Sequence, residues 1–225
     1  MPGPFADRHA VRMPTTAHLA AFVVASLVFI QVPGPSLLFT IGRALTVGRR
    51  DALLSVVGNA LGLAVQIVAV AVGLGPLIAA SAEAFWVLKV AGAAYVVYLG
   101  VQAVRHRVDA RRALEDAVVV QPGTAWTSVR TGIVVGLTNP KTIVFFVAFL
   151  PQFVDADAAA GPQILVLGLV FAVLACGSDS VWALAAGRAR TWFARKPERL
   201  DGLGVAGGVM MVGLGAALVT STGSH

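Results

Sequence analysis

The apolar residues of this chain fall into blocks of about 20, separated by short clusters of charge. A helix of that length spans the ~30 Å hydrocarbon core of a bilayer. Of the 225 residues, 57% are hydrophobic and only 12% are charged, whereas a soluble domain carries roughly 25% charged residues. Such a chain lacks the polar side chains needed to cover a water-exposed surface. The sequence therefore predicts an integral membrane protein in contact with the lipid bilayer.

Six apolar blocks predict six membrane-spanning helices and hence an all-α membrane protein. The predicted spans are 17–40, 54–80, 84–104, 130–150, 163–187 and 202–220. An alternative with five spans makes one block a re-entrant segment. The first 16 residues are expected to be a disordered lead-in, with Met1 and Met13 both open as the start of translation. No A-x-A-like cleavage site follows the first apolar block, so that block is expected to remain as a span.

The distribution of Lys and Arg predicts the orientation in the membrane. Basic residues gather in the loops after the first, third and fifth spans, whereas the loops after the second and fourth contain only acidic charges. Because basic loops stay in the cytoplasm, both termini are predicted to lie outside. The net charge of +6 follows from the same bias. The basic loops lack interleaved aromatic residues, so no nucleic-acid partner is expected.

The chain is expected to divide into two halves joined by a polar linker. The predicted parts are a first half at 17–104, a cytoplasmic linker at 105–129, a second half at 130–220 and a C-terminal tail at 221–225. Three spans in each half force the halves into opposite orientations. The first span of each half contains a proline beside a polar residue, Pro35-Ser36 and Pro140-Lys141. This match predicts two inverted three-helix repeats with proline-broken helices 1 and 4, although a chance coincidence of prolines is the alternative.

The first break lies in the segment QVPGPSLLF. Pro33 and Pro35, with Gly34 between them, remove backbone donors and are expected to unwind about one turn. In lipid, the carbonyls freed in this way need protein partners or a wet cavity. Pro35 suits the first turn of a second half-helix, whose amides favour an anionic group, and Gln31 and Ser36 add hydrogen-bonding groups. A simple kink is the alternative, but the doubled proline favours a functional break.

The second break contains the strongest candidate residues, Asn139, Pro140 and Lys141. They lie near the middle of the fourth predicted span, where an ammonium costs about 2.5–3.5 kcal/mol on insertion scales. Lys141 must therefore be paired, hydrated or directed into a cavity. The alternative, in which the lysine reaches back to the membrane surface, needs a position nearer the helix end. Asn139 offers both a donor and an acceptor beside the break.

Asp179, in the fifth predicted span, is the expected counter-ion of Lys141. Because the charge of each group depends on its protonation, such a pair is a candidate proton-responsive switch. A structural ion pair that only fixes helix packing is the alternative.

Other intramembrane polar residues are weaker candidates. Asn59 and Gln66 share one face of the second span, where hydrogen bonding between helices is the simpler role. Tyr95 suits an interfacial belt and a cavity lining equally well. The glycine-rich sixth span suits close helix contact and a possible homodimer. The lone Cys176 and four histidines outside the predicted membrane core predict no metal site and no cofactor.

These segments together resemble the LysE/RhtB family of amino-acid exporters over nearly the whole chain. The matching pieces are VPGPSLLFTIGRALTVGRRDALLSVVGNALG, GAAYVVYLGVQ, GLTNPKTIVFFVAFLPQFV and DSVW, the last of which adds Trp182 as a weaker candidate. The resemblance implies a six-span exporter in the bacterial inner (plasma) membrane, driven by the proton-motive force. It supports as functional residues Gly34, Pro35, Asn139, Pro140, Lys141 and Asp179. Ser36, where relatives often carry Asn or Asp, and the unusually polar Asn59 leave the substrate open.

The predicted function is a secondary transporter that exports a small neutral or hydroxylated amino acid, similar to homoserine or threonine, by alternating access with protons as the coupling ion. A cation exporter of the same superfamily is one alternative, although intramembrane Cys pairs and His clusters are lacking. A membrane enzyme or redox relay is the other. The sequence contains no nucleophile–base constellation and Cys176 has no partner cysteine, so no enzymatic activity is expected.

Overall fold

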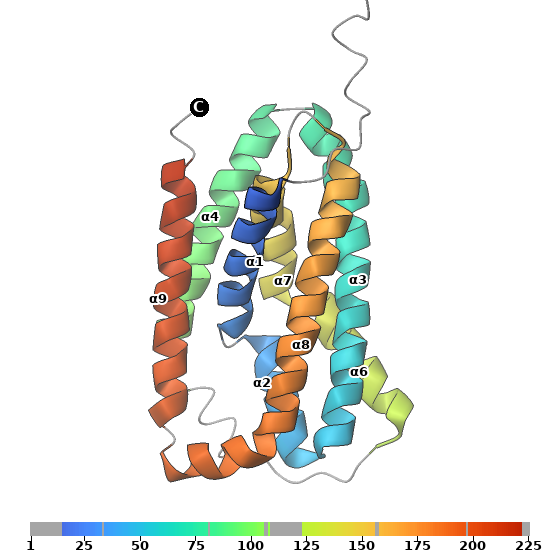
Figure 1. Cartoon of the computed structure of the whole chain (residues 1–225), viewed down its shortest axis with the longest axis vertical. Helices are drawn as coiled ribbons and strands as arrows, with labels where there is room; N and C mark the ends of the chain where they lie inside the picture. Colours follow the sequence, from blue (N-terminus) through green and yellow to red (C-terminus); the bar gives the residue numbers. More distant parts are fainter. Residues whose placement is uncertain are drawn as a thin grey trace, which may run out of the picture.

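The computed structural model describes residues 15–32, 34–80, 82–105, 108, 123–155, 158–196 and 198–221. Every regular element in these ranges is a helix, which confirms the all-α prediction for the described residues (Figure 1). The helices are α1 (Thr16–Gln31), α2 (Pro35–Thr46), α3 (Arg49–Ala80), α4 (Ala82–Arg105), α6 (Ala125–Thr138), α7 (Pro140–Val144), η1 (Phe145–Phe149), η2 (Leu150–Phe153), α8 (Ala160–Arg195) and α9 (Glu198–Ser221). Nearly all of the predicted lead-in, most of the predicted linker and most of the C-terminal tail lie outside the described residues.

Two helices are long and apolar enough to cross a membrane alone. They are Arg49–Leu74 within α3 and Ala160–Ala186 within α8, with mean hydropathies of 2.1 and 2.2. Two bent helix pairs raise the number of candidate spans among the described residues to four. These four lie at the first, second, fourth and fifth predicted positions, and α4 and α9 occupy the third and sixth. The helices run past the predicted ends because charged residues just outside an apolar block continue its helix, as at the start of α3.

Both predicted breaks are present as bends between two short helices. The axes of α1 and α2 differ by 54°, and the axis of α6 differs by 43° from that of the segment Pro140–Phe153. Pro35 and Pro140 occupy the first turn of the helices that follow the breaks, where a missing N–H costs no intrahelical bond. Pro33 lies outside the described residues. Beyond the second break, the helix passes through a π-helical turn and a 3₁₀ turn, η1 and η2.

Helix α3 packs against α6 and α8, while α4 packs against α9 (Figure 1). Glycines at four-residue spacing allow the α3–α6 contact, with Gly58 and Gly62 facing Gly132 and Gly136. A methyl group on Gly62 would lie 2.6 Å from the carbonyl oxygen of Ile133, and those on the other three would clash with backbone carbonyls as well. Such small residues let two helix backbones approach closely. This close approach brings the polar side chains of α3 to the second break.

A cluster of phenylalanine rings joins the two broken helices to α8. The ring of Phe145 is fully buried, and its centroid lies 4.4 Å from that of Phe29 and 4.5 Å from that of Phe171. Phe149 stacks on the same ring at 4.8 Å. Because these rings belong to α1, η1 and α8, their packing fixes the two breaks relative to each other.

We expect Gly58→Ala to lower the stability of the folded protein. The added methyl group overpacks the α3–α6 contact, which costs about 1–3 kcal/mol in well-packed proteins. Thermal unfolding in detergent micelles, followed by circular dichroism, measures the effect. Gly73→Ala is the matched control on the same helix, because a methyl group there meets no atom within 4 Å. Equal midpoints for the two variants would contradict the proposed role of the glycine contact.

Candidate functional site

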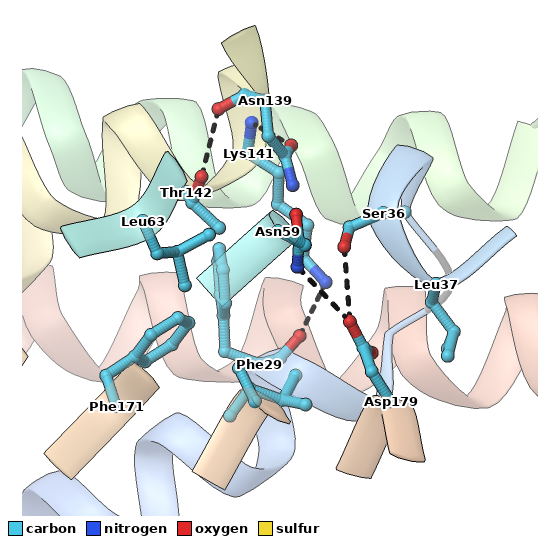
Figure 2. A pocket seen from close by; sticks show the side chains of 13 residues that line it. Phe29, Ser36, Leu37, Asn59, Leu63, Asn139, Lys141, Thr142, Phe171 and Asp179 are labelled. Atoms are coloured by element: carbon cyan, nitrogen blue, oxygen red, sulfur yellow. Dashed lines mark hydrogen bonds between the residues drawn. The ribbon is translucent and has the colours of Figure 1, made fainter. Parts of the chain in front are cut away.

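The two breaks face each other across one pocket (Figure 2). Its polar lining comes from α2, α3, α7, α8 and the residue between α6 and α7, namely Ser36, Asn59, Asn139, Lys141, Thr142 and Asp179. Phe29, Leu63 and Phe171 contribute apolar walls. The open space at its centre, about 30 Å³, has room for about two water molecules. A molecule as large as an amino acid can therefore enter only if the surrounding helices move apart.

Asn139 starts the helix that follows the second break. Its side-chain Oδ1 accepts a hydrogen bond from the backbone N–H of Lys141 at 3.1 Å, the usual contact of an N-cap residue. Its carbonyl oxygen accepts hydrogen bonds from the hydroxyl of Thr142 and the N–H of Ile143, both at 3.1 Å. The Asn-Pro pair thus restarts the helix at a defined residue and fixes the position of Lys141.

Gln66 supplies hydrogen bonds to two backbone carbonyls on the other side of the same break. In an unbroken helix, the carbonyl of Gly136 would accept a hydrogen bond from residue 140, but that residue is a proline and has no N–H. The carbonyl of Leu137 would likewise accept from the N–H of Lys141, but this N–H donates to the side chain of Asn139 instead. The Nε2 of Gln66 donates to both carbonyls, at 2.8 and 2.9 Å. Gln66 was predicted to hydrogen-bond between helices, and its partners prove to be the carbonyls of the break.

Lys141 reaches from the second break to the first. Its buried ammonium donates to the carbonyl oxygens of Phe29 and Val32, both at 2.6 Å, and lies 4.6 Å from the centre of the Phe29 ring. In a continuous helix the Phe29 carbonyl would accept from residue 33, which is a proline and has no N–H. Besides the lysine, it accepts only a longer hydrogen bond, of 3.3 Å, from the N–H of Val32 among the described residues. A cation at this end of α1 is also favoured by the helix dipole.

Gly34 makes room for the lysine stem. A Cβ atom on Gly34 would lie 2.8 Å from Cδ of Lys141, closer than a side chain tolerates. The glycine between the two prolines therefore lets the lysine pass in its observed position, and a Cβ atom there would force the lysine stem to shift.

Asp179 faces the pocket from α8 and is 5% exposed. Its Oδ2 accepts hydrogen bonds from the hydroxyl of Ser36 and the amide of Asn59, both at 3.3 Å. The charges of Lys141 and Asp179 interact across the pocket, but their hydrogen bonds go to different partners. The expected pair therefore takes the form of two opposite charges facing one small space (Figure 2).

The remaining predicted residues lie outside the pocket lining. Gln31, at the end of α1, donates to Ser178 Oγ at 3.0 Å and accepts from Trp182 Nε1 at 3.2 Å, which ties α1 to α8. Tyr95 packs against Tyr98 on α4 with ring centroids 5.5 Å apart. Pro35 occupies the first turn of α2 with an exposed side chain.

Sequence reasoning missed Phe29, Thr142 and Ser178. Phe29 and Ser178 lie within predicted spans without a motif to distinguish them, whereas Thr142 directly follows the candidate triplet Asn-Pro-Lys. Within the described part of the chain, no group of three or more His, Cys, Asp or Glu side chains has the arrangement of a metal site.

We expect Gln66→Leu to destabilise the protein by about 1–3 kcal/mol, because it removes the amide donor of the buried Gly136 carbonyl and the part-buried Leu137 carbonyl. Chemical or thermal unfolding in detergent measures the loss. Gln102→Leu, at an exposed position on α4, is the matched control and should leave the midpoint unchanged. A Gln66→Leu protein as stable as its control would show that the two carbonyls do not depend on this amide.

Comparison with known proteins identifies the family. The LysE type translocator family matches residues 27–222. The chain is 36% identical to an uncharacterized membrane protein of Vibrio cholerae over 202 residues, covering 89% of this chain and 96% of that protein. It is 33% identical to a homoserine/homoserine lactone efflux protein of Salmonella typhimurium over 201 residues, covering 89% and 95%. No solved structure matches the chain significantly. The chain therefore belongs to the LysE family of translocators.

Proposed function

We propose that this protein is a secondary transporter that exports small neutral or hydroxylated amino acids, similar to homoserine, across the bacterial inner membrane. The observation that carries the proposal is the meeting of Lys141, Asp179 and the backbone of two proline breaks in one pocket. Charged groups inside a membrane mark substrate and ion pathways, and discontinuous helices are a common site of solute binding in transporters. The efflux relatives at 33% identity support the substrate class.

We also propose that six spans form two inverted repeats, with the basic loops in the cytoplasm. The helix contacts support this arrangement, because equivalent elements of the two halves make equivalent contacts. In the first half, the broken pair α1–α2 packs on α8 of the second half. In the second half, the broken helix that begins with α6 packs on α3 of the first half. The last helices of the two halves, α4 and α9, pack on each other. An exchange of partners of this kind is expected for halves related by an approximate two-fold axis.

The pocket contains complementary groups for a zwitterion. The ammonium of Lys141 and the amides in the first turn of α2, which lacks a side-chain cap, suit a carboxylate. The carbonyls of the first break and the carboxylate of Asp179 suit an ammonium. Both sets line a space that admits only about two waters. Transport therefore requires the halves to separate on one side and then on the other.

Asp179 is the proposed coupling group. Protonation removes its negative charge and weakens its attraction for Lys141 across the pocket. Ser36 and Asn59, which belong to α2 and α3, both donate to this carboxylate. A change in the charge of Asp179 therefore alters its hydrogen bonds with α2 and α3, and with them the packing of α8 against these two helices.

Export itself is tested in inverted membrane vesicles from cells that express the protein. We expect energised vesicles to accumulate radiolabelled homoserine several-fold above vesicles without the protein, and a protonophore to abolish the difference. A panel of neutral, hydroxylated, acidic and basic amino acids then defines the substrate. Absence of accumulation for every amino acid on the panel would exclude the proposed function.

The coupling role of Asp179 is tested with Asp179→Asn in proteoliposomes. Asparagine retains the shape and hydrogen-bonding capacity but not the charge, so we expect loss of proton-driven accumulation while exchange of labelled for unlabelled amino acid continues. Lys141→Met should impair both activities, because the lysine contacts both breaks. Glu83→Gln, at an exposed position on α4, is the control. Proton-driven accumulation at the wild-type rate in Asp179→Asn and Lys141→Met would disprove the mechanism.

A further inference from the structure

We infer that the carbonyls of Phe29 and Val32, together with the ring of Phe29, form the ammonium subsite of the transport pocket, which Lys141 occupies in the substrate-free protein. The transported molecule then binds by displacing an ammonium that belongs to the protein. This inference rests on the proposed function and deepens it, because it names the group that anchors the substrate.

The three groups around the lysine nitrogen would recognise any primary ammonium. Two carbonyl oxygens accept from it at 2.6 Å, within the short range of charge-assisted hydrogen bonds. The Phe29 ring lies 4.6 Å away, which adds a cation–π contact. All three groups lie at the C-terminal end of α1, where the helix dipole favours positive charge. None of them is specific for a lysine side chain.

The pocket also offers Lys141 a second place to bind. Asp179 lines the same small space, and its two donors, Ser36 and Asn59, are neutral groups at 3.3 Å, beyond the usual hydrogen-bond distances. A cation that approaches this carboxylate gains a stronger interaction than either donor provides. The lysine ammonium can therefore move from the carbonyls to Asp179 and leave the subsite free, without placing either charge in lipid.

The substrates named for the efflux relatives favour an ammonium anchor. Homoserine and its lactone share a primary ammonium, but only homoserine has a free carboxylate, because the lactone closes it into a ring ester. A site that holds both molecules cannot depend on a carboxylate partner. Applied to this chain, the ammonium is the indispensable group of the substrate, and the carboxylate is dispensable.

Chemical rescue tests the subsite directly. Lys141→Ala removes three carbons and the nitrogen of the side chain, which n-propylammonium replaces. We expect n-propylammonium chloride to raise the thermal midpoint of the purified Lys141→Ala protein by about 2–4 °C. Neither 1-propanol nor sodium chloride at equal concentration should do so. Wild type and Lys196→Ala, which changes an exposed lysine between α8 and α9, should not respond to the amine.

A second variant covers the case in which Lys141→Ala fails to fold. Lys141→Met keeps an unbranched side chain one atom shorter than lysine and removes the competing charge. It should bind homoserine lactone at least tenfold more tightly than wild type, and N-acetylhomoserine lactone should bind to neither protein. No rescue by the amine and no tighter binding by Lys141→Met would overturn the inference.

The same measurements separate this inference from the proposed function. Rescue by n-propylammonium in a protein that exports no amino acid would support the subsite and reject the exporter. Export by the wild type without rescue or tighter binding would support the exporter and reject the subsite.

Discussion

The contact on which the site depends is the pair of hydrogen bonds from the Lys141 ammonium to the carbonyls of Phe29 and Val32. It joins a residue of the second break to the backbone of the first, 109 to 112 positions away in the chain. A buried ammonium and two helix-end carbonyls would each be costly alone in a membrane. Paired, they satisfy one another and hold the broken ends of α1 and α7 at one place.

Each proline break is thus completed by a side chain from another helix. Lys141 of α7 serves the carbonyls at the end of α1, and Gln66 of α3 serves those at the end of α6. The glycine contact between α3 and α6 makes the second arrangement possible, because Gln66 has to approach the backbone of α6 closely. The hydrogen bonds to the carbonyls at the second break therefore depend on the close packing of α3 and α6. The pocket lies where the ends of the two broken helices meet.

Much of the site follows from local sequence. A proline in an apolar block, with a lysine or a glycine beside it, predicts a broken helix and a cavity at the break. Five of the predicted site residues line the pocket, namely Gly34, Ser36, Asn139, Lys141 and Asp179. The role of Gln66 does not follow in this way, since its partners are 70 and 71 residues away. Nor does that of Phe29, which contributes a carbonyl and a ring but is one apolar residue among many in the sequence.

Segment length, proline chemistry and the cost of a charge in lipid are local properties. The amino-acid sequence therefore suffices to predict a helical, apolar chain, the places where its helices break and the charges that lie among apolar residues. The partners of those charges depend on contacts between segments far apart in the chain, so they are apparent only in the folded protein. Asp179 is the predicted counter-ion of Lys141, and both line one pocket. Their hydrogen bonds go elsewhere, because the Lys141 ammonium donates to two backbone carbonyls and Asp179 accepts from Ser36 and Asn59. A proline removes the regular helical donor of the carbonyl four residues before it, and the charged Lys141 ammonium lies close enough to take that place.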